Sequence, residues 1–162
     1  VAGFDLSGAT FREGIDATGA RFLGLSWFGG ARFGGRADFG GALFLNDARF
    51  ERACFDGQAR FAGAEFRGIG RFDAAEFKTG ADFSDVVSYG NFSLQQVVLQ
   101  QIARFRGSEW LGGLWCQQAE LPADCDLADT QVHGRLWLRG ARHGNRALAE
   151  ADFAMSFGYT YV

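Results

Sequence analysis

The sequence predicts an all-β fold, a four-sided parallel β-helix with about 22 residues in each coil. Three observations lead to it. Phenylalanines recur at alternating intervals of five and six residues from Phe22 to Phe83. A small residue lies two places before each of them, so that both side chains of an extended segment point the same way. Glycine makes up 24 of 162 residues and is frequent just after these anchors, where a sharp corner needs positive φ.

The period continues on both sides of the phenylalanine-rich stretch. Counting backward reaches Leu6, and counting forward reaches Leu138, with nine of the ten anchor positions after Phe83 apolar. We therefore expect one β-helix over residues 1–147, followed by a capping or dimerisation tail over residues 148–162. The four inward ladders are Phe11, Phe33, Phe55, Phe77, Leu99, Leu121; Ala17, Phe39, Phe61, Phe83, Phe105, Leu127; Phe22, Phe44, Phe66, Ser88, Trp110, Val132; and Leu6, Phe28, Phe50, Phe72, Leu94, Cys116, Leu138.

The choice of four faces follows from the alternation and from charge. Three faces would place a five-residue step against a six-residue step and lose register between coils. Two faces would stack Arg49, Arg60 and Arg71 directly, and like charges in line are unfavourable. With four faces the column becomes Asp38, Arg60, Asp82, which alternates in sign, so four faces are favoured.

Composition excludes several classes of protein. The formal net charge is -3, which provides no basic surface for nucleic-acid phosphates. No apolar run is long enough for a membrane span, and no secretory signal is visible. The three cysteines have no metal-site spacing and cannot all pair within one chain, so we expect reduced thiols and a cytoplasmic protein. Because the chain starts with Val1 inside the repeat, we expect a trimmed or excised segment.

The repeated A-x-F-x-x pattern resembles the pentapeptide-repeat proteins. The stretches "ARFGGRADFGGALF" and "ARFAGAEFRGIGRFDAAEF" carry the resemblance, strongly from Ala20 to Phe83 and more loosely to Leu138. It implies a right-handed, four-sided parallel β-helix. This chain departs from the pattern by one extra residue in every second step, where we expect a corner bulge. The expected bulge positions are Arg36, Asp47, Gln58, Ile69 and Gly80.

The sequence offers little for catalysis, and we expect a protein that is not an enzyme and binds no cofactor or metal. Stacked rings would fill the bore and leave no pocket with convergent polar groups. Only His133 and His143 could act as histidine bases, and His143 falls at an anchor position near the last coil, where a capping or half-exposed histidine is expected. No glycine-rich loop is followed by a helix with lysine.

Binding must then use the outer faces, and one face is acidic. It holds seven acids against Arg60, Arg104 and Arg106, whereas the remaining positions sum to +1. Its proposed partner-binding residues are Asp38, Asp82, Asp85, Asp126 and Asp129. The family resemblance implies a surface that imitates DNA and binds a type II topoisomerase such as gyrase, protecting it from drugs or toxins. The alternative is that the acidic face is only solvated surface. The protein would then be a structural or assembly module excised from a longer chain, with no topoisomerase role.

Aromatic side chains mark a second surface. Trp115 and Trp137 lie 22 residues apart and should stack on one outer face, with Trp27 in the same column. Exposed tryptophans are good interface anchors. The tail alternates Phe153, Met155, Phe157, Tyr159 and Tyr161 with small residues, which is typical of a one-sided strand. It could cover the tryptophans, cap the last coil or pair with its copy in a homodimer.

The stretch "VVSYGNFSLQQVVLQQ", residues 86–101, breaks the pattern. Ser88 replaces a phenylalanine rung, and Val86, Phe92 and Val97 replace small residues. Two interpretations remain open: repacking at constant volume, or a bend or loop at Tyr89–Gly90 that interrupts the rod.

Overall fold

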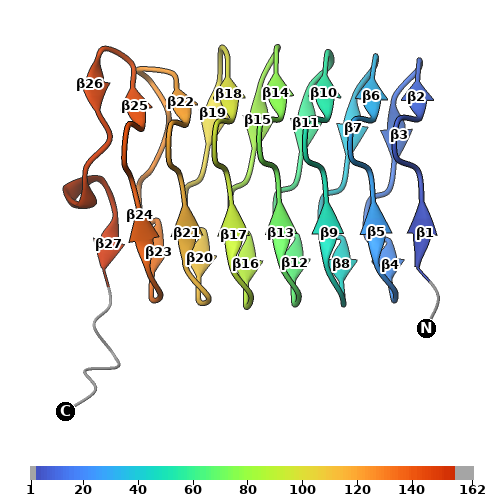
Figure 1. The fold of residues 1–162 in the computed structure, drawn as a ribbon, viewed down its shortest axis with the longest axis horizontal. Helices are drawn as coiled ribbons and strands as arrows, with labels where there is room; N and C mark the ends of the chain where they lie inside the picture. The colour runs from blue at the N-terminus through green and yellow to red at the C-terminus, as the bar shows by residue number, and fades with distance from the viewer. Residues whose placement is uncertain (1–2, 156–162) are drawn as a thin grey trace.

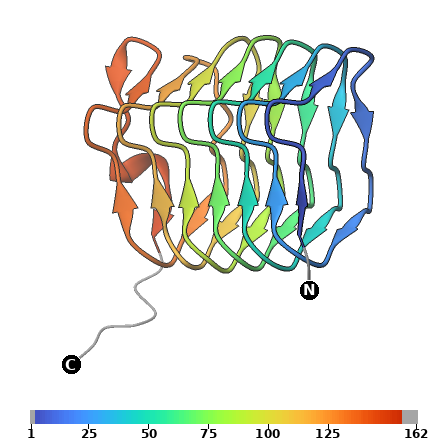
Figure 2. The ribbon, with the colours of Figure 1, turned by 45° about the vertical axis from the view of Figure 1, so that its right-hand side comes forward.

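The computed structural model describes residues 3–155, which form a parallel β-solenoid of four sheets (Figure 1). Each coil adds one short rung to each sheet in turn, so that through β22 strands four apart in sequence are hydrogen-bonded neighbours. Beyond that point they are three apart at β20–β23, β21–β24 and β22–β25, because sheet C contributes only a bridge at Asp126. The coils follow one another along the long axis from the N-terminal to the C-terminal end (Figures 1 and 2). The predicted coil length is confirmed, because Phe55 pairs in register with both Phe33 and Phe77, which lie one predicted coil before and after it.

We name the sheets A to D in the order in which the chain visits them. Sheet A holds β1 (Phe4–Asp5), β5 (Ser26–Trp27), β9 (Ala48–Arg49), β13 (Gly70–Arg71), β17 (Phe92–Ser93), β21 (Leu114–Trp115) and β24 (Leu136–Trp137). Sheet B holds β2 (Thr10–Phe11), β6 (Arg32–Phe33), β10 (Cys54–Phe55), β14 (Glu76–Phe77), β18 (Val98–Leu99), β22 (Glu120–Leu121), β25 (Arg142–His143) and β26 (Arg146–Ala147).

The other two sheets complete the four sides. Sheet C holds β3 (Ile15–Asp16), β7 (Ala37–Asp38), β11 (Ala59–Arg60), β15 (Ala81–Asp82) and β19 (Ala103–Arg104). A parallel bridge between Arg104 and Asp126 extends sheet C by one more rung. Sheet D holds β4 (Arg21–Phe22), β8 (Leu43–Phe44), β12 (Glu65–Phe66), β16 (Val87–Ser88), β20 (Glu109–Trp110), β23 (Gln131–Val132) and β27 (Ala154–Met155).

The core consists of stacked side chains, as the ladders predict. The rings of Phe33 and Phe55 lie 4.7 Å apart with an interplanar angle of 5°, and those of Phe55 and Phe77 lie 4.6 Å apart at 2°. Between ladders the rings meet edge to face, as Phe55 and Phe61 do at 6.1 Å and 80°. Both arrangements suit the aromatic quadrupole. These phenylalanines are fully buried, so side chains fill the inside of the solenoid.

The five-residue and six-residue steps make different corners. The five-residue steps connect sheet A to B and sheet C to D through a hydrogen-bonded turn, in which the Ala31 N–H donates to the Phe28 carbonyl at 3.0 Å. The third turn residue has positive φ, as at Gly30 with +66°, which is typical of a type II turn. The six-residue steps connect sheet B to C and sheet D to A, and the expected extra residue lies there, just before the strand, as at Arg36.

The irregular stretch at 86–101 does not interrupt the rod. Val87 and Ser88 pair with Glu109 and Trp110 on the next coil and with β12 on the coil before. Phe92 is buried, and its ring lies 4.6 Å from that of Trp110. The core therefore repacks within a continuous rod, and the bend or loop at Tyr89–Gly90 that would interrupt the rod is wrong.

The C-terminal coil departs from the repeat. After β25 the chain reverses into β26, which pairs with β25 in antiparallel orientation, and continues through the 3₁₀ turn η1 (Glu150–Asp152). β27 then returns to sheet D and pairs in parallel with β23. The Arg146 guanidinium holds the Asp152 carboxylate with two hydrogen bonds of 2.6 and 2.9 Å. Leu148 and Phe153 are buried in this region.

The part of the chain that the structure describes has no helix whose length and apolar character would let it cross a membrane.

Candidate protein-binding surface on sheet C

The acidic residues predicted to form one face lie together on sheet C and the turns that follow it. Asp38 on β7 and Asp82 on β15 are outward residues of one column, and Asp126 occupies the same column at the bridge beyond β19. Asp85 and Asp129 lie at the third position of the turns from sheet C to D, with φ of 56° and 55°. All five predicted residues are thus on one side of the solenoid, three on the sheet and two at its edge.

Arginines on the same side pair with three of these five acids. Arg36 and Arg60 contact Asp38 at 2.7 and 3.1 Å. Arg106 contacts Asp126 at 2.8 Å and Asp129 at 3.6 Å. Within residues 3–155 neither Asp82 nor Asp85 has an ion pair; Asp82 instead accepts the Ser84 N–H at 2.9 Å. The column on sheet C reads Asp16, Asp38, Arg60, Asp82, Arg104, Asp126, so its charge alternates from Asp38 onward.

The pKa values of two carboxylates reflect these contacts. Burial raises the pKa of the Asp38 carboxyl, but the hydrogen bond from the Gly40 N–H and the contact with Arg60 outweigh it and lower the pKa overall. The Ala128 N–H, followed by the Arg106 guanidinium, lowers the pKa of Asp126. Both acids are therefore charged at neutral pH, and each is partly compensated by an arginine.

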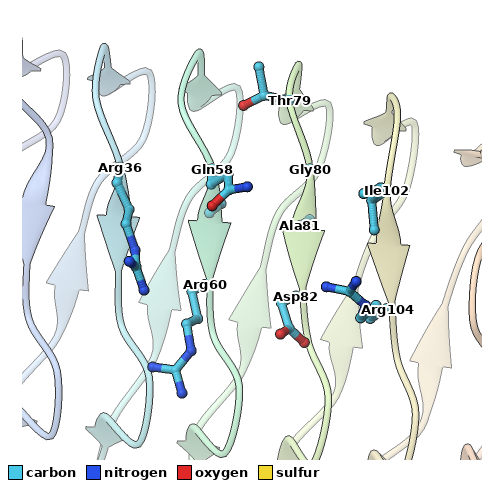
Figure 3. Close-up of a pocket in the computed structure, with 10 residues that line it drawn as sticks. Arg36, Gln58, Arg60, Thr79, Gly80, Ala81, Asp82, Ile102 and Arg104 are labelled. Atoms are coloured by element: carbon cyan, nitrogen blue, oxygen red, sulfur yellow. The ribbon is translucent and has the colours of Figure 1, made fainter.

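A shallow hollow of about 100 Å³ lies between the strands of sheet C and the corner that precedes them. Figure 3 shows Arg60, Asp82 and Arg104 on successive strands, with Gly80 and Ile102 at the corner beside them. Ile102 is 50% exposed, which is high for a large apolar residue. Sequence reasoning missed Ile102. The signal was available, because Ile102 occupies the extra-residue position of its six-residue step.

The tryptophans occupy sheet A, on the opposite side of the solenoid. Trp115 and Trp137 pair in register on β21 and β24, which confirms that they share a column with Trp27. Trp27 and Trp137 are 38% and 44% exposed. Arg49 and Arg71 lie between Trp27 and Ser93 in this column. A hollow of about 550 Å³ extends over Trp27 and these two arginines.

The tail residues named for capping or dimerisation fall partly within the described chain. Phe153 is buried among the core residues of the last coil. Phe157, Tyr159 and Tyr161 lie outside the described residues. Whether the tail joins two chains stays a prediction.

The histidines and cysteines are dispersed over the described part of the chain. No group of three or more histidine, cysteine or acidic side chains within residues 3–155 could hold a metal ion. Burial raises the pKa of Cys116 and of Cys125 to about 12. His143 is half-buried, and its Nδ1 lies 2.7 Å from Arg146.

Comparison with known proteins identifies the repeat. Residues 2–43 match a family model described as pentapeptide repeats in nine copies. No curated protein and no solved structure matches the chain. The same register continues coil after coil beyond the matched segment through β23, with Trp110 paired to Val132. Residues 2–43 are thus similar to pentapeptide repeats, and residues 3–155 fold as a four-sheeted parallel β-solenoid.

Proposed function

We propose that the protein is a non-enzymatic, protein-binding solenoid that acts through the outer face of sheet C. The observation that carries the proposal is the column of charged side chains on a rod whose interior is filled. Because Phe rings occupy the core, a partner has access only to outward residues. Their positions are fixed by strands that pair with a neighbour on both sides, so the surface is preorganised for binding.

The best specific candidate for the partner is a type II topoisomerase, with sheet C imitating DNA. Support comes from the family resemblance and from Asp82 and Asp85, which have no arginine partner in the described chain. The ion pairs of Asp38, Asp126 and Asp129 weaken the negative field that such imitation requires. They favour the second candidate, an assembly module whose sheet C contacts a partner of mixed charge.

A gyrase supercoiling assay with and without a quinolone separates the two candidates. The topoisomerase candidate predicts inhibition or drug protection by the wild-type protein at micromolar concentration. Changing Asp82, Asp85, Asp126 and Asp129 to asparagine should reduce the effect at least tenfold. The matched control changes four acids on or beside sheets A, B and D to glutamine: Glu51, Glu65, Glu76 and Glu120. No effect of the wild type removes the topoisomerase candidate, and equal loss in both variants removes the role of sheet C.

A further inference from the structure

The charges in the outer column of sheet C are complementary to those of the same column read in the opposite direction. From β11 onward it reads Arg60, Asp82, Arg104, Asp126, one residue on each successive rung. Reading it backward exchanges every arginine for an aspartate. Rungs of a parallel sheet are about 4.8 Å apart, so two such columns facing one another keep the same spacing.

This pattern selects one relative orientation of two chains. If two copies face each other across sheet C about a two-fold axis that runs along their parallel long axes, every residue of the column meets itself, and like charges repel. If the axes are antiparallel, with a two-fold axis between the rungs of Asp82 and Arg104, Asp82 of each copy faces Arg104 of the other. On the next rungs outward, Arg60 faces Asp126. An isologous contact of this kind gives each favourable pair twice.

The residues at the two edges of sheet C are also placed for contacts about the same two-fold axis. At the turns toward sheet D, Asp85 of one copy faces the turn of the other that holds Arg106 and Gly107. Within its own chain Arg106 also contacts Asp126 and Asp129, so this edge contributes less than the central pairs. At the corner from sheet B, the exposed Ile102 faces Gly80, which has no side chain. The hollow beside Asp82 is lined by Gly80, so an apolar side chain finds room there (Figure 3).

The residues nearest the axis are free to make these contacts. Asp82 and Arg104 lie opposite each other on neighbouring strands of one chain. Neither side chain forms an ion pair within residues 3–155, and Asp82 accepts only the Ser84 N–H. Arg104 and Asp85 are exposed. A contact with a second copy would supply the opposite charges that the single chain leaves unused.

We infer that sheet C is an isologous, antiparallel interface for a second copy of this chain, centred between Asp82 and Arg104. The inference rests on the proposed protein-binding role of sheet C and names its partner. A face only a few rungs long is smaller than the roughly 800 Å² per partner of stable complexes. We therefore expect a weak dimer that salt dissociates, since exposed charge pairs are screened by ions.

Sedimentation velocity on the full chain tests the inference over a range of protein concentrations. At low ionic strength we expect a monomer–dimer equilibrium, and 0.5 M NaCl should raise the dimer Kd at least tenfold. Asp82→Arg and Arg104→Asp should each raise it at least tenfold, because each places like charges across the axis. A monomer at all concentrations overturns the inference, as does a dimer that neither salt nor these variants affect.

Combining the variants gives the sharper result. A mixture of Asp82→Arg and Arg104→Asp chains should form heterodimers, because one chain then carries arginine at both positions nearest the axis and the other carries aspartate at both. The double variant Asp82→Arg/Arg104→Asp should homodimerise as the wild type does, which a parallel arrangement does not allow. If the double variant stays monomeric while folded by circular dichroism, the antiparallel interface is wrong.

Glu120→Arg on sheet B is the matched control, because it also puts an arginine beside another, Arg142. It should leave the dimer Kd unchanged, and a tenfold rise in this variant would show that the effect is not specific to sheet C. Self-association is measured without any other protein, so its failure is distinct from failure of the proposed function. A monomer whose acidic face still acts on gyrase would overturn only the dimer.

Discussion

Gly70 and Phe92 lie opposite each other on neighbouring rungs of sheet A, and the Phe92 ring fills the space that a side chain at Gly70 would need. A Cβ at position 70 would lie 2.6 Å from two ring atoms of Phe92. In the regular coils this inward position holds alanine, as at Ala48. Ser88 leaves a gap in the core where the neighbouring coils have an aromatic ring, and the Phe92 side chain occupies it. The glycine at position 70 leaves room for that larger side chain.

Changing Gly70 to alanine should destabilise the protein by about 1–3 kcal/mol, because the added methyl group overpacks the core against Phe92. Urea unfolding monitored by circular dichroism measures the change. Gly29→Ala is the control, since a Cβ there lies 3.7 Å from its nearest neighbour and the backbone does not have positive φ. That variant should be neutral or slightly stabilising. Equal unfolding free energies for the two variants would contradict the packing described.

Changing Phe55 to alanine should cost about 3–5 kcal/mol, because it removes a fully buried ring that stacks on Phe33 and Phe77. The same unfolding measurement applies. Phe4→Ala is the comparison, because Phe4 is 38% exposed at the N-terminal end of the described solenoid. Its loss should cost about 1 kcal/mol. A cost at Phe55 no larger than that at Phe4 would show that the stacked rings do not carry the stability.

The three cysteines should react very differently with a thiol reagent at pH 8. Cys116 and Cys125 are buried and have pKa values raised to about 12, so they remain neutral thiols in the folded protein. Cys54 is only half-buried, although burial and Asp56 raise its pKa as well. We expect one slowly reacting thiol in the native protein and three in guanidinium chloride. Native Cys54→Ser protein should not react, and a reacting thiol in that variant would disprove the burial of the other two.

The contribution of Asp38 to stability should depend on pH. Its folded-state pKa is lowered, so the stabilisation is present above the unfolded-state value of about 3.9 and is lost as the pH falls through the folded-state value. Asp38→Asn should therefore reduce the unfolding free energy by about 1–2 kcal/mol at pH 7 and by less at pH 3. Glu120→Gln removes an exposed acid that has no ion pair within residues 3–155, so it should change little at either pH. A pH-independent difference at Asp38 would mean that its charge is not what stabilises the fold.

Most of the fold could be predicted because it depends on spacing alone. The length of one coil follows from the alternation of steps, and it places Phe33, Phe55 and Phe77 in one stack. Charge alternation in the column of Asp38, Arg60 and Asp82 correctly distinguished four faces from two.

The remaining features depend on contacts that spacing does not determine. The reversal into β26 follows from a hairpin and from the pairing of Arg146 with Asp152, which lies outside the repeat. The acidic side was predicted as a set of residues, but its partial neutralisation depends on where the long arginine side chains at Arg36 and Arg106 extend. The position of an arginine in the sequence predicts the coil on which it lies, but not the direction in which its side chain extends.

The constant length of the coils determines how the chain can become longer or shorter. Each coil contacts only the coils before and after it, so removing residues 50–71 would bring equivalent strands together and leave a shorter rod. Removing half a coil would instead bring the strands of sheet A against those of sheet C, and the outer charges would no longer alternate. Insertions and deletions of whole coils therefore preserve the strand register. The charges of the sheet C column repeat every second rung, so only a change of two coils also preserves their alternation, and removing one coil would place Asp38 beside Asp82.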